Sequence, residues 1–92
     1  MNYVEPQHQE LTFGQKAVGL KFNPSGDETV NKAKQLSADL IDLVEDKYKE
    51  RLNKLTTVTR QLSWMENVLR TAAFNAIIAA QMAVVKFLTW ND

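Results

Sequence analysis

The 92-residue sequence contains no cysteine and only one histidine, His8. Without cysteine there are no disulfides, no thiolate metal ligands and no cysteine nucleophile, and one histidine cannot form a zinc cluster or a catalytic triad. Since 45% of the residues are hydrophobic, the chain is expected to fold, and its length suits one domain. We therefore predict one folded unit with no metal site, no cofactor and no catalytic residues.

The sequence also has no excess of either charge, because 11 Lys and Arg residues balance 11 Asp and Glu residues. Proteins that hold long nucleic acids depend on summed positive charge, so that class of partner is not expected. A small anionic ligand needs only a local basic site.

Long hydrophobic runs are absent as well. The N-terminus lacks the basic start and apolar stretch of a secretory signal. Between Arg70 and Lys86 the apolar stretch covers residues 71–85, which is shorter than the roughly 18 to 20 residues that span a bilayer. We therefore expect no membrane association and a cytosolic protein.

Glycine and proline are confined to the first 26 residues. This boundary predicts an N-terminal segment with a ligand-binding turn at residues 1–26 and a helical region at 27–92. Residues 16–22 are compatible with a short strand or a loop. For the helix start, Ser25 and Glu28 have the spacing of a capping box, and Asp27 is the competing N-cap.

Beyond residue 27 the apolar positions recur at helical spacing. One stripe contains Val30, Ala33, Ser37, Leu40 and Val44, and another repeats every seven residues at Ile41, Tyr48, Leu55, Leu62 and Leu69. A single rod could not bury these stripes, so we predict an all-α helical hairpin with its turn near residues 56–59, where β-branched residues weaken helix propensity.

The second helix is apolar nearly all round. Its small-residue seam, suited to close helix packing, contains Leu69, Ala73, Ala76, Ala80, Ala83, Phe87 and Trp90. The opposite arc carries Phe74, Ile78, Met82 and Val85, which the partner helix is expected to leave uncovered. Either the N-terminal segment folds back over this arc or the chain forms a homo-oligomer, and the size of the patch favours the oligomer.

Acidic residues also cluster on the first helix, at Asp39, Asp42, Glu45, Asp46 and Glu50. A Mg²⁺-dependent hydrolase would need a second acidic pair on the facing helix, which offers only Glu66. Basic residues follow directly, so the pattern indicates a solvated face of mixed charge, and we do not expect an enzyme.

The helix start is the best candidate for a ligand site. Basic residues surround it, at Lys16, Lys21, Lys32 and Lys34. Free backbone N–H groups at a helix N-terminus favour phosphate, Gly26 permits close approach, and Phe22 can stack on a base. This predicts a nucleotide phosphate site, although an ordinary capped helix with Phe22 as a hydrophobic staple has the same ingredients.

Residues 13–26, FGQKAVGLKFNPSG, with Val30, Lys34 and residues 38–42, resemble the helical-hairpin domain shared by phage anti-CBASS and anti-Thoeris sponges. Residues 80–90, AQMAVVKFLTW, are similar to the second helix of that family. The likeness covers residues 13–90.

This resemblance implies a non-enzymatic phage counter-defence protein in the cytoplasm of the infected bacterial host. It would sequester cyclic oligonucleotide second messengers and so block CBASS immunity. The family forms compact homohexamers that hold cyclic dinucleotides between protomers and cyclic trinucleotides near threefold axes. The alternatives are an anti-Thoeris sponge for cyclic ADP-ribose isomers and a structural helical oligomer without a small-molecule ligand.

The resemblance also implies site residues. Lys34 matches the lysine that meets phosphate, and the base-stacking aromatic corresponds to Phe22, with Phe13 as the next candidate. Trinucleotide contacts are expected from the helix-start turn and from an arginine on the second helix, for which Arg70 is the nearest match, a few residues from the expected position. The ligand-binding residues expected around the turn are Asn23, Ser25, Gly26 and Lys32.

Overall fold

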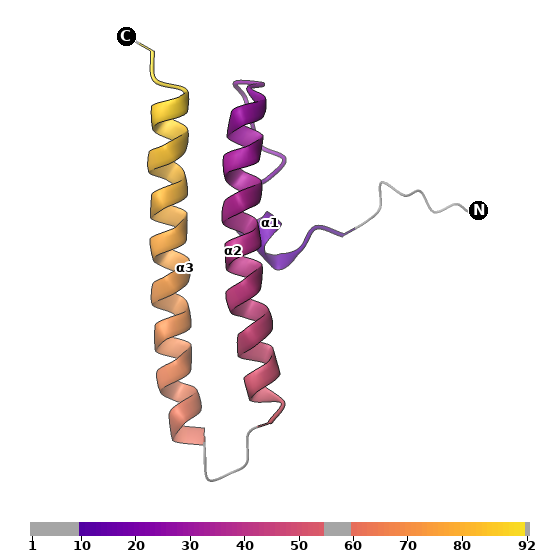
Figure 1. Cartoon of the computed structure of the whole chain (residues 1–92), viewed down its shortest axis with the longest axis vertical. Coiled ribbons are helices and arrows are strands. Elements are labelled where there is room, and N and C mark those ends of the chain that lie inside the picture. The colour runs from indigo at the N-terminus through magenta and orange to yellow at the C-terminus, as the bar shows by residue number, and fades with distance from the viewer. Residues whose placement is uncertain (1–9, 55–59, 92) are drawn as a thin grey trace, which may run out of the picture.

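The computed structural model describes residues 10–54 and 60–91, which contain three helices and no strand. α2 (Glu28–Leu52) and α3 (Arg60–Leu88) lie side by side and antiparallel, and the short α1 (Phe13–Ala17) packs against α2 (Figure 1). This confirms the predicted all-α hairpin. The predicted turn at residues 56–59 lies outside the described residues.

α1 is the element that the sequence analysis missed. Thr12 caps it: the Thr12 hydroxyl accepts from the Gln15 backbone N–H at 3.0 Å, and the Gln15 side chain accepts from the Thr12 N–H at 2.9 Å. This is a complete capping box, and the Thr-x-x-Gln spacing was its signal. After Val18, the chain turns through Gly19, which has a φ of 62°, so the loop alternative holds only for the second part of residues 16–22.

A close backbone contact docks α1 on α2. The Gly14 N–H donates to the Asp42 carboxylate at 2.7 Å, and a Cβ at Gly14 would lie 2.1 Å from the Ala38 carbonyl oxygen. Only glycine permits this approach.

The start of α2 decides between the two predicted caps. The Asp27 carboxylate accepts from the Thr29 N–H at 2.8 Å, so Asp27 is the N-cap. The predicted Ser25–Glu28 capping box is wrong, because the Ser25 hydroxyl donates to Asn23 Oδ1 and accepts from the Asp27 N–H instead. Ser25 therefore shapes the turn that precedes the helix.

The core lies where α1, α2 and α3 meet. Val18, Ala38 and Ile41 are buried there, and the partly buried residues packed around them are Leu20, Phe74, Ile77 and Ile78. Val30, which is also buried, and Ile41 each contribute roughly 1.5–3 kcal/mol by burial.

The buried stripe of α2 differs from the predicted one. Its members are Val30, Lys34, Ala38, Ile41 and Glu45, whereas Leu40 is 49% exposed. Hydropathy misplaced the stripe because Lys34 and Glu45 are buried charged residues with partners close by.

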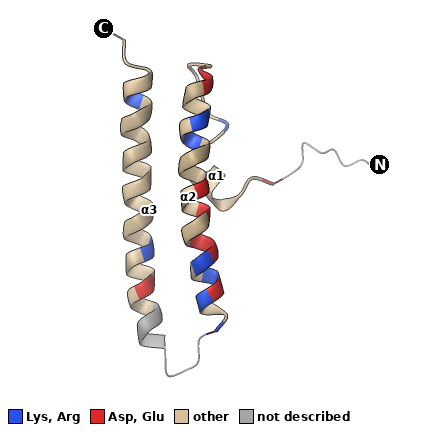
Figure 2. Ribbon diagram, viewed as in Figure 1, with Lys and Arg blue, Asp and Glu red and all other residues tan. Residues whose placement is uncertain are grey.

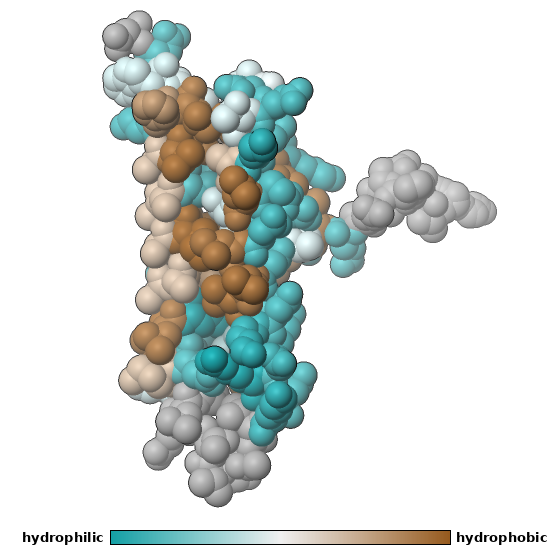
Figure 3. Space-filling view, in the orientation of Figure 1, coloured by the Kyte–Doolittle hydropathy of each residue, from teal (hydrophilic) through white to brown (hydrophobic). Residues whose placement is uncertain are grey.

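The predicted faces of α3 were wrong in part, and the N-terminal segment covers part of the arc, as one of the two predicted alternatives expected. Phe74 and Ile78 face the core, and the N-terminal segment folds back over them, with the rings of Phe13 and Phe74 5.5 Å apart. Met82 remains 62% exposed. Most of the small-residue seam also lies on the surface, where Phe87 is 79% exposed. Figure 3 shows apolar side chains along α3 and beside its boundary with α2.

Charge is distributed unequally between the two long helices. Figure 2 shows most Lys, Arg, Asp and Glu residues on α2, and few on α3. The segment Trp64–Leu88, which contains an 18-residue window with a mean hydropathy of 1.6, has the length and composition of a membrane-crossing helix. The core helix of a soluble protein passes the same test but is mostly buried, whereas only 6% of this window is buried inside the chain.

Candidate ligand site beside the start of α2

An open cavity of about 740 Å³ lies between the turn and the first part of α2. It is lined by one apolar and six polar or glycine residues: Leu20, Lys21, Asn23, Gly26, Asn31, Lys32 and Gln35. Gly26 lies in the left-handed region with a φ of 70°, and a Cβ there would meet no atom within 4 Å. The cavity therefore combines the predicted turn with two lysines and three amides.

Lys34 does not line the cavity but holds the turn that forms part of its wall. Its side chain is buried, and its ammonium group donates to the carbonyl oxygens of Gly19, at 3.1 Å, and Phe22. The Lys34 ammonium nitrogen also lies over the Phe22 ring, 5.5 Å from the ring centroid. Lys34 thus holds both ends of the turn at Gly19–Phe22 against α2.

Two chains of hydrogen bonds orient the amide side chains. Asn23 Nδ2 donates to the Asp27 carbonyl oxygen and to Asn31 Oδ1, each at 2.9 Å. Gln35 Nε2 donates to Asp39 at 2.7 Å, while Gln35 Oε1 accepts from Gln15 at 3.1 Å. The oxygens of Asn31 and Gln35 are therefore engaged within the protein, and their uncommitted groups are N–H donors.

Lys21 and Lys32 add positive charge to these donors. Neither side chain forms an ion pair or a hydrogen bond within the described residues. Together with Asn31 and Gln35, they give the cavity donors that match the oxygens of a phosphate group.

The backbone N–H groups at the N-terminus of α2 do not themselves provide the anion site. Asp27 places a carboxylate there and accepts from the Thr29 N–H. This carboxylate satisfies an N–H group on which the predicted phosphate site relied, and it repels an approaching anion. The donors lie instead to one side of the helix start.

The two candidate stacking residues occupy different environments. Phe22 adjoins Lys21 and Asn23 of the cavity wall and is 71% exposed, so its ring is accessible to a base. Phe13 packs on Phe74 in the fold-back contact. The structure thus groups Phe22, Asn23, Gly26 and Lys32, with Ser25 and Lys34 supporting the turn.

Arg70 lies elsewhere, in the hairpin. Its Nε donates to Glu45 at 2.7 Å, and its guanidinium carbon lies 4.5 Å and 4.9 Å from the ring centroids of Tyr48 and Phe74. It lines a separate cavity of about 310 Å³ between α2 and α3. Within a single chain, Arg70 is therefore not part of the turn site.

The acidic residues of α2 also have structural partners. Asp42 binds the Gly14 N–H, and Glu45 pairs with Arg70. Within residues 10–54 and 60–91, no three His, Asp, Glu or Cys side chains are grouped so that they could hold a metal ion.

Sequence reasoning placed Lys21 near the site without naming it as a ligand contact, and it missed Asn31 and Gln35. Lys21 was visible as one of the basic residues, whereas Asn31 and Gln35 could have been found only from their spacing of one helical turn beside Lys32. Comparisons with protein-family models, curated proteins and solved structures found no match.

Proposed function

We propose that this protein binds and sequesters cyclic oligonucleotide second messengers without transforming them, as a phage counter-defence protein in the cytoplasm of the infected bacterial host. The observation that carries this proposal is the donor-lined cavity beside the exposed Phe22 ring. A cyclic dinucleotide or trinucleotide offers phosphate oxygens for the donors and a base for the ring.

Binding without catalysis agrees with how the nearby carboxylates are used. Asp27 caps α2, and Asp39 accepts from Gln35. A sponge requires affinity and a preorganised site rather than a general base or nucleophile. The hydrogen bonds of Lys34 and Asn23 hold the turn in one conformation before ligand arrives.

The exposed surface of α3 supports the proposal that the functional unit is a homo-oligomer, with a hexamer implied by the family resemblance. Small side chains at Ala76, Ala80 and Ala83 permit close helix approach, and the exposed Leu69 and Phe87 flank them. A second copy would cover this surface, and a symmetric assembly suits a symmetric cyclic ligand.

Isothermal titration calorimetry and thermal shift test the function directly. We would titrate the protein with cyclic di-AMP, cyclic tri-AMP, a cyclic ADP-ribose isomer and linear pApA, the last as the matched acyclic control. The proposal expects micromolar or tighter binding of a cyclic di- or trinucleotide, with a concentration-dependent rise in Tm. Recovery of intact ligand after denaturation would show that no reaction has occurred.

The same panel separates the alternatives. Binding of the cyclic ADP-ribose isomer alone would indicate an anti-Thoeris sponge, whose pyrophosphate would meet the same donors. If every nucleotide leaves Tm unchanged and calorimetry detects no heat, the sponge function is excluded and a structural oligomer becomes the better explanation.

A further inference from the structure

We infer that Lys21 and Lys32, assisted by the amide groups of Asn31 and Gln35, hold the ligand phosphates, whereas Lys34 is a positioning residue that builds the turn. This inference rests on the proposed function and reassigns the phosphate contacts within the same site.

Lys34 is poorly placed to take a phosphate. It is only 6% exposed, and two of its three N–H donors already serve the carbonyl oxygens of Gly19 and Phe22. Turning the ammonium group toward a ligand would leave both carbonyls without this partner and would release Phe22, the residue expected to stack on a base. Lys34 therefore acts through the turn.

Lys21 and Lys32 have the opposite properties. Both side chains belong to exposed residues that line the cavity, and neither has a carboxylate partner in the described parts of the chain. One comes from the turn and the other from α2, so the two charges approach the cavity from two elements. Such a pair can meet a phosphate without breaking an interaction among the residues that the structure describes.

The amide groups determine which part of a nucleotide fits here. The Asp27 carbonyl oxygen fixes the orientation of Asn23 and hence that of Asn31, while the Asp39 carboxylate fixes that of Gln35. Asn31 therefore offers its NH₂ group, and Gln35 offers its remaining N–H. Recognition of an adenine edge needs a donor and an acceptor together, whereas the Asn31 and Gln35 oxygens each already accept a bond within the protein and the groups without a partner there are N–H donors. The phosphates therefore enter the cavity, and the bases lie outside it near Phe22.

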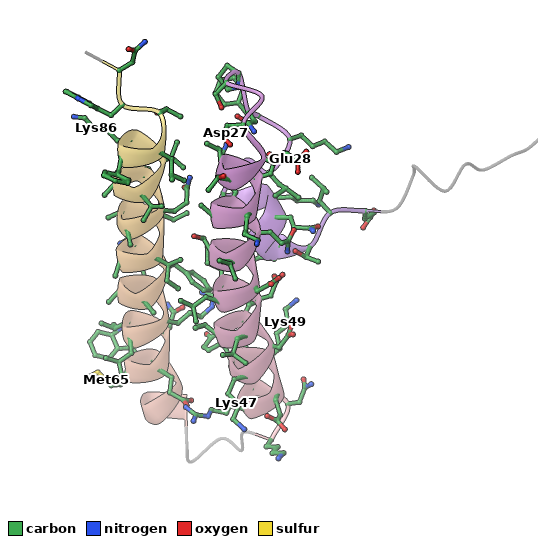
Figure 4. The ribbon with its side chains drawn as sticks, turned by 45° about the horizontal axis from the view of Figure 1, so that its top comes forward. Asp27, Glu28, Lys47, Lys49, Met65 and Lys86 are labelled. Atoms are coloured by element: carbon green, nitrogen blue, oxygen red, sulfur yellow. The ribbon has the colours of Figure 1, made fainter. Side chains whose placement is uncertain are left out.

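The experiment compares Lys21→Gln, Lys32→Gln and Lys34→Gln with Lys49→Gln as a matched control. Lys49 is an exposed lysine at the other end of α2 (Figure 4). Each variant would be titrated with cyclic di-AMP at 50 mM and 300 mM NaCl, and its free-state Tm and hydrogen exchange over residues 18–26 would be measured.

Lys21→Gln and Lys32→Gln should each weaken binding about tenfold or more and reduce its salt dependence, because a screened charge contact has been removed. Their free-state Tm and hydrogen exchange should match those of the wild type. Lys34→Gln should lower the Tm, speed exchange in the turn and weaken binding, while the remaining affinity keeps the wild-type salt dependence. Lys49→Gln should change nothing.

The opposite pattern would overturn the inference. If Lys21→Gln and Lys32→Gln bind like the wild type, while Lys34→Gln loses affinity with unchanged turn exchange, Lys34 contacts the phosphate directly. If the wild type binds no nucleotide, the proposed function fails, and inorganic pyrophosphate then becomes the probe. If the wild type binds pyrophosphate and Lys21→Gln and Lys32→Gln abolish that binding, the two lysines form an anion site. If the wild type does not bind pyrophosphate, the inference is overturned.

Discussion

Arg70 donates to the carboxylate of Glu45 at 2.7 Å across the hairpin, and its guanidinium group also contacts the rings of Tyr48 and Phe74. Glu45 is buried and Arg70 is mostly covered. A slip of α3 by one helical turn, about 5.4 Å, would separate the pair and leave its charges inside the hairpin without partners. This ion pair therefore fixes the register of α2 against α3.

Arg70→Met should lower the free energy of unfolding by about 2–4 kcal/mol, because it leaves the Glu45 carboxylate buried without its cation. Urea unfolding followed by circular dichroism at fixed protein concentration measures the change. Arg70→Met combined with Glu45→Leu should recover much of the loss, since both buried charges are then removed. If the double variant is no more stable than the single one, the argument from charge is wrong.

Gly14→Ala should detach α1 from α2, because the added Cβ would lie 2.1 Å from the Ala38 carbonyl oxygen. We expect a loss of about 1–3 kcal/mol, typical of overpacking. Relative to the wild type, hydrogen exchange should speed up more over Phe13–Ala17 than over the middle of α2. Lys16→Ala, at an exposed position of the same helix, is the control and should leave exchange unchanged.

Phe22→Ala should weaken binding of a cyclic dinucleotide about 5- to 150-fold, as expected for loss of roughly 1–3 kcal/mol of base stacking. Light scattering should show the same assembly as for the wild type, because the Phe22 ring is exposed on the turn rather than on α3. Phe22→Tyr retains a stacking ring and should bind nearly as well as the wild type. Equal losses in both variants would argue against stacking.

Ala80→Glu should dissociate the proposed oligomer, since it places a charge in the middle of the exposed small-residue seam of α3. Multi-angle light scattering should give a molar mass several times 10.5 kDa for the wild type and near 10.5 kDa for the variant. Lys49→Glu, on α2 and away from this surface, is the control and should remain assembled.

A wild-type chain that is monomeric would exclude self-association as the cover of α3. Flotation with phosphatidylcholine and phosphatidylglycerol vesicles would then test whether lipid covers Trp64–Leu88, the segment with the composition of a membrane helix. Figure 4 shows Met65 on this helix pointing away from α2, so a partner that covers this face should lower the exposure of the Met65 side chain.

Periodicity and breaker positions were enough to predict the hairpin, because glycine and proline end before residue 27 and the apolar spacing is helical from there. They were not enough to predict which faces are buried. The buried stripe includes Lys34 and Glu45, and their carbonyl and guanidinium partners come from distant parts of the chain. Hydropathy treats such residues as surface.

The place of the candidate site could be predicted from the sequence in outline. The cavity lies at the end of α2 to which the basic residues and the Pro24–Gly26 turn pointed. The sequence did not show that Lys34 is buried in the turn while Lys21 and Lys32 are exposed. That difference depends on Gly19 and Phe22 turning their carbonyl oxygens toward Lys34. Backbone direction of that kind is set by the folded turn and leaves no side-chain signature.

Lys34 is held in the turn by backbone carbonyl groups, which are also ligands for metal cations. Its ammonium group sits among backbone carbonyl oxygens, as a potassium ion does in a channel filter. Here the cation is covalently attached to the helix that it serves. The loop is therefore held by a cation of its own chain, and its shape should be indifferent to the potassium, sodium or chelator content of the surrounding solution.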